Sequence, residues 1–205
     1  MRVVPLFRND PSDYSCVSYW LLGENNHASD RNTLLDTGSA HPDNLSFMLR
    51  EMALWPKGIG KRAVEQIILT HAHFDHTGGL PGLDGLLGPI TYAWLPSGQQ
   101  HRPVQDGQAV TVGDQPGILL HTPGHSEDSI CLFLPETGTL FSGDTLYRIT
   151  DHLGSYPQAY VNSLERLAEL NIKTIYPGHG HPIAQGAVGF IRTCLDNVHH
   201  SLIHG

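Results

Sequence analysis

The stretch Thr70-His71-Ala72-His73-Phe74-Asp75-His76-Thr77-Gly78-Gly79 decides the fold and the chemistry of this chain. Four potential metal ligands fall within six residues, directly after the apolar run 64–69, which is typical of a buried strand. His71 and His73 are two positions apart, so extended backbone would project both side chains to the same side. Asp75 and His76 would then face elsewhere. The stretch therefore predicts two groups of ligands at neighbouring points, which is what a two-metal site needs.

Histidine content offers an alternative interpretation, because a chain with 14 histidines in 205 residues can contain a histidine-rich polar loop. A chance His-x-His-x-Asp-His in such a composition has odds of roughly one per cent or less. Three further candidate ligands, His125, Asp144 and His179, each follow a predicted strand. Loops after strands converge at one edge of a layered α/β protein, so we expect all seven side chains to meet.

Length and composition predict one ordinary domain over residues 1–205, with 40% apolar residues. No run approaches the ~20 apolar residues of a membrane span, and charge appears too early for a secretory signal, so we expect no membrane contact and a cytoplasmic location. A net charge of −8 disfavours binding of nucleic acid.

The three cysteines lack Cys-x-x-Cys spacing and are expected to be buried thiols. The sequence contains no signal that sets an oligomeric state.

The pattern of apolar residues predicts an alternation of strands with a few helices. Asp36 ends a short strand, where its carboxylate would either accept a hydrogen bond from the metal loop or cap its own turn. Residues 80–88 have weak helical character at best, 97–106 read as a polar connection, and 147–158 read as one long loop. Strands are expected at 3–7, 17–22, 33–38, 66–69, 90–94, 109–112, 117–121, 129–134, 139–142 and 173–176, and helices at 42–54, 159–170 and 184–203.

Five pieces of the chain, in order, resemble the metallo-β-lactamase superfamily. The resemblance implies an α/β fold, the four-layer αββα sandwich, with the site on its edge. The bridging position of Asp144 is most similar to the glyoxalase II and RNase Z branches, and 123–170 resembles the small glyoxalase II-like hydrolases. The pieces are Leu35-Asp36-Thr37-Gly38, Thr70 to Gly79, Thr122 to Ser126, Phe141 to Thr145, and Pro177 to Gly180.

Carried over residue by residue, the resemblance implies two divalent metal ions. His71, His73 and His125 would hold the first; Asp75, His76 and His179 the second; Asp144 would bridge both, and Asp36 would support the loop. Nitrogen and carboxylate ligands fit zinc best, with iron or manganese as alternatives. His181, two residues from His179, would lie beside the site or on the surface.

The expected reaction is hydrolysis of an acyl substrate, because two metal ions that share a water lower its pKa toward neutrality. Asp75 would orient the attacking hydroxide, which bridges the metals. A thiolate leaves without acid help, so small-molecule thioesters are favoured. The long loop supplies candidate substrate contacts at Arg148, His152 and Tyr156. Alternatives are an endoribonuclease of the same fold, a mononuclear-iron sulfur dioxygenase, a β-lactamase or lactonase, and a non-catalytic metal scaffold.

Overall fold

A computed structural model describes residues 1–95 and 101–205. Its first sheet has the order β1-β2-β3-β4-β5-β6, antiparallel from β1 to β3 and parallel from β3 to β6. The strands and helices of this first half of the chain are β1 (Arg2–Leu6), β2 (Ser18–Leu22), β3 (Thr33–Leu35), α1 (Pro42–Ala53), β4 (Gln66–Ile68), α2 (Phe74–Thr77), α3 (Leu80–Leu87), β5 (Ile90–Ala93) and β6 (His101–Pro103).

The second sheet has the order β12-β10-β9-β8-β7, and a two-stranded sheet pairs β11 with β13. All neighbours in the second sheet are antiparallel except β10 and β12, which are parallel. The elements of this half are β7 (Gln108–Val112), β8 (Gln115–His121), β9 (Ile130–Leu134), β10 (Thr139–Gly143), β11 (Ser155–Pro157), α4 (Gln158–Ala168), β12 (Thr174–Pro177), α5 (Ala187–His199) and β13 (Leu202–His204).

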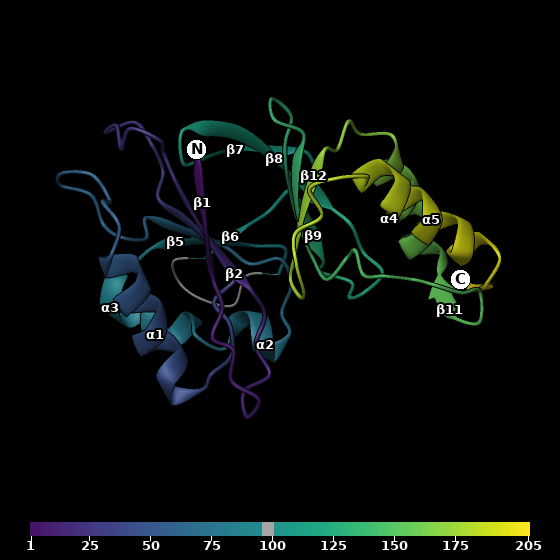
Figure 1. The fold of residues 1–205 in the computed structure, drawn as a ribbon, viewed down its shortest axis with the longest axis horizontal. Helices are drawn as coiled ribbons and strands as arrows, with labels where there is room; N and C mark the ends of the chain where they lie inside the picture. The colour runs from purple at the N-terminus through teal and green to yellow at the C-terminus, as the bar shows by residue number, and fades with distance from the viewer. Residues whose placement is uncertain (96–100) are drawn as a thin grey trace.

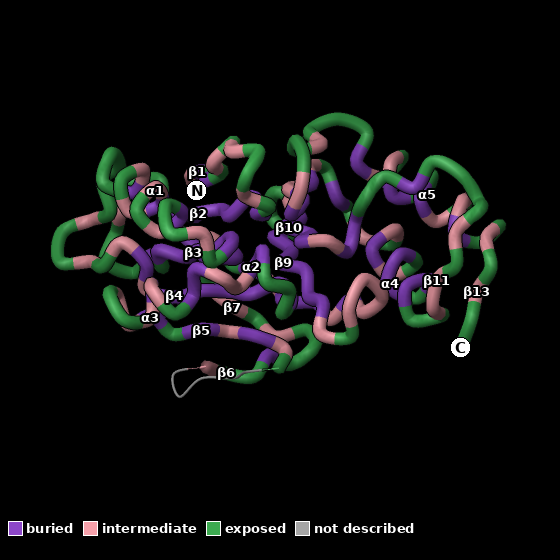
Figure 2. The backbone as a smooth tube through the Cα atoms, turned by 90° about the horizontal axis from the view of Figure 1, so that it is seen from below, coloured by how far each residue is buried: buried purple, intermediate pink, exposed green. Residues whose placement is uncertain are grey.

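The two large sheets face each other, and helices cover their outer faces (Figure 1). Leu35 of the first sheet and Leu119 of the second belong to the core between the sheets. A second core packs Met48 of α1 against Ile67 of β4, and a third packs Leu164 of α4 beneath the second sheet. Buried segments run through the middle of the molecule in Figure 2. The chain therefore forms the expected αββα sandwich.

Strand direction brings the candidate ligands to one edge. Because β8 and β10 are both antiparallel to β9, they run in the same direction, and β12 is parallel to β10. The carboxyl ends of β8, β10 and β12 therefore lie at the same edge, and His125, Asp144 and His179 follow those ends. In the first sheet, the stretch after β4 reaches this edge, where the Thr70 carbonyl accepts a hydrogen bond from the Ile130 N–H at 2.8 Å.

The expectation of weak helical character at residues 80–88 was wrong, because α3 is an α-helix over Leu80–Leu87. Pro81 stands in its first turn, where a missing N–H costs nothing, and Gly88 ends it with a left-handed φ of 55°. Leu80 and Leu83 are buried against the first sheet, so their packing outweighs the low helix propensity of the glycines.

Three other expectations need correction, and all concern short edge strands. β11 lies within the predicted loop 147–158, and β6 lies within the predicted connection 97–106, of which 97–100 fall outside the described residues. The last helix begins after Gly186, which has a left-handed φ of 70°, and ends at His199. β13 replaces the predicted helical end and pairs in parallel with β11.

Candidate metal centre

Asp36 fixes the loop that carries four of the candidate ligands. It follows β3 with a φ of 56°, a region that aspartate enters more readily than most residues. One carboxylate oxygen accepts a hydrogen bond from the Thr70 N–H at 2.7 Å, and the other accepts from the Thr70 hydroxyl at 2.8 Å. The second oxygen also lies 2.8 Å from Nδ1 of His76. Because a carboxylate only accepts, the His76 proton is on Nδ1 and its Nε2 carries a lone pair when the ring is neutral.

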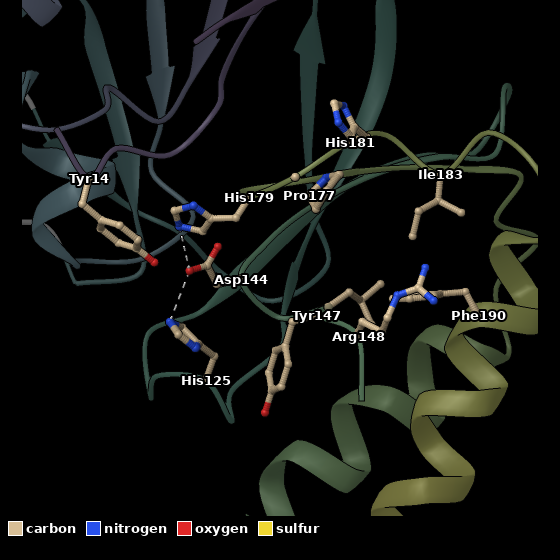
Figure 3. A pocket seen from close by; sticks show the side chains of 12 residues that line it. Tyr14, His125, Asp144, Tyr147, Arg148, Pro177, His179, His181, Ile183 and Phe190 are labelled. Atoms are coloured by element: carbon tan, nitrogen blue, oxygen red, sulfur yellow. Dashed lines mark ion pairs between the residues drawn. The ribbon is translucent and has the colours of Figure 1, made fainter. Parts of the chain in front are cut away.

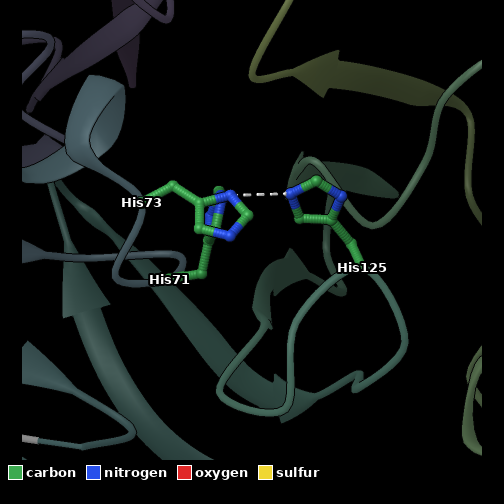
Figure 4. A group of neighbouring side chains, drawn as sticks. All are labelled: His71, His73 and His125. Atoms are coloured by element: carbon green, nitrogen blue, oxygen red, sulfur yellow. Dashed lines mark hydrogen bonds between the residues drawn. The ribbon is translucent and has the colours of Figure 1, made fainter.

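His71, His73 and His125 form the first group of ring nitrogens, shown in Figure 4. Nδ1 of His73 lies 3.0 Å from Nε2 of His71 and 3.0 Å from Nε2 of His125. Burial, followed by the neighbouring charge of His76, lowers the pKa of His71 to about 3, and burial also lowers the pKa of His125. Both rings are therefore neutral at pH 7, and their lone pairs are available to a cation.

Asp75, His76 and His179 form the second group. The short helix α2 holds Asp75 and His76, and the turn after β12 brings His179 to them. Nε2 of His179 approaches Oδ2 of Asp75 to 3.0 Å, and Nε2 of His76 lies 3.7 Å from the same oxygen. These three atoms are buried, yet none has a hydrogen-bond partner among the described residues. The ligand atoms of the three residues lie within 4.8 Å of one another.

Asp144 lies between the two groups. One of its oxygens is 3.6 Å from Nε2 of His125, 4.0 Å from Nε2 of His71 and 3.5 Å from Nε2 of His179, and the other is 3.4 Å from Nε2 of His76. Figure 3 shows its contacts with His125 and His179. Burial opposes the charged form of Asp144, but the neighbouring His179 and His76 rings favour that form and lower its pKa. The carboxylate is ionised and can serve both groups.

Two glycines let the backbone come this close. A Cβ on Gly178 would lie 2.3 Å from Oδ1 of Asp144, and a Cβ on Gly143 would lie 2.5 Å from the Thr70 hydroxyl. Gly143 also has a left-handed φ of 48°. Side chains larger than hydrogen would separate the segments that carry the candidate ligands.

The donor set fits divalent metal ions. Two metal-bound nitrogens at ~2.0–2.1 Å stand about 3.3 Å apart in a tetrahedral site, close to the histidine spacing seen here. Burial disfavours the imidazolium of His76, but the charge and hydrogen bond of Asp36 and the nearby Asp144 carboxylate outweigh it and raise the pKa of His76. A field that holds a proton on a buried ring also attracts a metal cation. Cys16 lies beside Asp36 and His76, fully buried.

A cavity of about 670 Å³ opens beside the cluster. His125, Asp144 and His179 form one end of it, and Phe190 of α5 lies on its wall (Figure 3). Tyr14 also lines it and stacks on the ring of His179, with centroids 5.2 Å apart. Sequence reasoning missed Tyr14 and Phe190, because an aromatic residue in a loop or on an amphipathic helix carries no signal for the cavity it borders.

The structure separates the three residues predicted to contact substrate. Arg148 lines the cavity, whereas His152 and Tyr156 are not among the described residues that line it. Tyr156 lies in β11, pairs with Ile203 of β13 and stacks on Tyr160 at 5.7 Å. His181, the nearby alternative to His179, also lines the cavity. Substrate contact by His152 or Tyr156 stays a prediction.

The fold and the site define a class, the αββα sandwiches that bind divalent metal ions at one edge. The chain belongs to the metallo-beta-lactamase superfamily, whose family model matches residues 14–93 and 95–179. Among the described residues, no helix has the length and apolar character needed to cross a membrane.

Curated relatives support this membership. Lactamase-like protein nscB of Neosartorya fischeri is 37% identical over 154 residues, covering 72% of this chain and 44% of that protein. Atrochrysone carboxyl ACP thioesterase dmxR1 of Cryptosporiopsis sp. is 28% identical over 185 residues, covering 87% of this chain and 54% of that protein. The chain therefore spans about half the length of these relatives.

Solved structures show the same fold. The metallo-beta-lactamase family protein TTHA1429 from Thermus thermophilus has a TM-score of 0.71 at 23% identity, covering 97% of this chain and 78% of that one. TTHA1623, solved in a di-iron-bound form, has a TM-score of 0.64 at 25% identity, covering 93% of this chain and 96% of that one.

Proposed function

We propose that this protein is a glyoxalase II-like metallohydrolase with a dinuclear site, acting on small acyl thioesters or related acyl substrates. His71, His73 and His125 would hold one ion; Asp75, His76 and His179 would hold the other. Asp144 would bridge them, and Asp36 would orient His76.

The observation that carries this proposal is the set of buried, unpartnered donor atoms on Asp75, His76 and His179. Leaving a buried polar atom unpaired costs about 1–3 kcal/mol, so three together at one point favour a shared cation. Asp144 contacts both groups, which supports two ions rather than one. Imidazole nitrogens and carboxylate oxygens suit zinc, which we propose as the metal, and iron and manganese also accept such a set. The di-iron form of TTHA1623 is a precedent for two ions.

Two arguments favour thioesters. One relative is named an acyl carrier protein thioesterase, and the leaving group of a thioester departs as a thiolate without needing a proton. Alkoxide and amine leaving groups are more basic and need an acid, which makes lactones, β-lactams and amides harder substrates. The chain's acidic balance disfavours a nuclease.

Bound divalent ions would supply an activated water and polarise the acyl carbonyl. Asp75 is 3% exposed and lies in the short helix α2, so its carboxylate is placed to orient the attacking water and accept its proton. Water adds its oxygen to the acyl carbon, the carbon–sulfur bond breaks, and sulfur leaves with the electron pair. The products are a carboxylate, a thiolate and the protons that water released.

The test combines metal analysis with a substrate panel. Protein purified without chelator should contain two ions per chain and should hydrolyse thioesters faster than lactones, β-lactams or a phosphodiester. His71→Ala and Asp144→Ala should lose bound metal and turnover together, whereas His199→Ala, which removes an exposed histidine of α5, should lose neither. One iron per chain with sulfur oxidation, or full activity in Asp144→Ala, would contradict the proposal.

A further inference from the structure

Two cavities meet at Arg148 and Phe190. The first, of about 670 Å³, ends at the candidate ligands, and the second, of about 370 Å³, extends along α5. Arg148 and Phe190 line both of them. Figure 3 shows the Arg148 guanidinium beside Phe190 and Ile183, away from Asp144. A ligand with its reactive carbonyl at Asp144 would reach Arg148 with another part of its structure.

The backbone around Arg148 is fixed to α5. The Tyr147 carbonyl accepts a hydrogen bond from the Cys194 thiol at 3.4 Å, and the Ile149 carbonyl accepts one from the Asn197 side-chain N–H at 2.8 Å. Ile149 is itself buried, at 5% exposure. The backbone on both sides of Arg148 is therefore anchored to α5, which helps to position the side chain for recognition.

The guanidinium of Arg148 makes no hydrogen bond or ion pair within the described residues. The cavity walls near it are apolar, formed by Leu146, Ile183 and Phe190, and it is the sole Lys or Arg among the described residues that line the larger cavity. A guanidinium carries five N–H donors in a planar fork that matches a carboxylate or phosphate. Arg148 is exposed at the cavity wall and forms no ion pair with the Asp144 carboxylate of the same cavity, so its guanidinium is accessible to an external anion.

We propose that Arg148 is a specificity-determining residue that binds a carboxylate or phosphate group of the substrate while the acyl carbonyl lies at the metal centre. This inference rests on the proposed function, because it places the hydrolysed bond at Asp144. The anion has two possible positions. It belongs either to the acyl group, as in a dicarboxylic acyl thioester, or to the thiol, as in the phosphate of a phosphopantetheine arm.

Two pairs of substrates distinguish these sources. Butyryl-phosphopantetheine against butyryl-N-acetylcysteamine tests a phosphate on the thiol, and glutaryl-N-acetylcysteamine against butyryl-N-acetylcysteamine tests a carboxylate on the acyl group. Each pair gives a ratio of kcat/KM for the metal-loaded protein. Arg148→Gln should lower one ratio about tenfold or more, since a charge-assisted hydrogen bond is lost. Arg192→Gln, on the exposed side of α5 and outside both cavities, should keep both ratios.

A binding measurement separates this inference from the proposed function. Calorimetry with the S-butyl thioethers of phosphopantetheine and N-acetylcysteamine, and with the S-(4-carboxybutyl) thioether of N-acetylcysteamine, needs no hydrolysis. Wild-type protein should bind one anionic thioether about tenfold or more tightly than the neutral one, and Arg148→Gln should lose that preference. If no thioester is hydrolysed but the preference exists and depends on Arg148, the proposed reaction fails and the anion site stands. If Arg148→Gln changes neither ratio nor the preference, the inference is wrong.

Discussion

Replacing Gly178 by alanine should damage the metal centre without breaking the fold. A Cβ at this position would lie 2.3 Å from Oδ1 of Asp144 and 2.8 Å from Cε1 of His76. Ordinary contact begins at 3.4 Å, so the Asp144 oxygen would have to move by about 1 Å.

The backbone cannot retreat to make this room. Gly178 donates its N–H to the Gly143 carbonyl at 2.8 Å, and its own carbonyl accepts from the Val17 N–H at 2.7 Å. Its φ lies outside the left-handed region, so alanine causes no backbone strain there. The cost therefore falls on Asp144 and His76. A displacement of about 1 Å at a reacting group can cost about 100-fold in rate, and we expect that loss in kcat/KM for Gly178→Ala.

The assay measures thioester turnover, metal content and thermal unfolding on the same preparations. Gly178→Ala should bind less metal than wild type while it still unfolds cooperatively. Gly189→Ala is the matched control, because a Cβ there meets nothing within 4 Å and the residue lies inside α5. That control should keep activity and gain about 0.5–1 kcal/mol of stability from helix propensity. Wild-type activity with full metal content in Gly178→Ala would show that Asp144 need not occupy its present position.

The other predictions concern the support of the loop and the buried thiols. Asp36→Asn would place an amide N–H₂ toward donors on Thr70 or His76. Chemical denaturation should therefore show a free energy of unfolding lower by about 1–3 kcal/mol, and metal titration should show about 10–100-fold weaker binding. Unchanged metal affinity would rule out a supporting role for Asp36. Burial raises the pKa of Cys131 to about 11 and also raises the pKa values of Cys16 and Cys194, so few thiolates form below that range. A thiol reagent at pH 8 should therefore label none of the three cysteines in folded protein and all three after denaturation, and rapid labelling of the folded state would contradict their burial.

The candidate ligands could be predicted from the sequence because each group of them follows an apolar strand within a few residues. Strand ends and the Pro-Gly-His turns before His125 and His179 are local signals, and the sheet order then brings them together. Short edge strands were missed for the opposite reason. β6, β11 and β13 have three residues each, all exposed or half-buried, and their pairing depends on distant partners.

Helix α3 and the cavity show two further reasons why some features could not be predicted from the sequence. Glycines that lower helix propensity in α3 also allow close packing, since a Cβ on Gly82 would lie 2.5 Å from a methyl of Leu45 in α1. Tertiary packing thus decided an element that local propensity disfavoured. Tyr14 and Phe190 come from distant parts of the chain and line the same cavity, and no sequence pattern within either segment predicts this.

The candidate centre takes donors from both halves of the chain. Four belong to 71–76, beside the first sheet, and His125, Asp144 and His179 follow strands of the second. Ions bound there would cross-link the two sheets. A chelator would then lower the stability of the fold as well as remove activity. A newly synthesised chain could bind its ions only after both halves had docked.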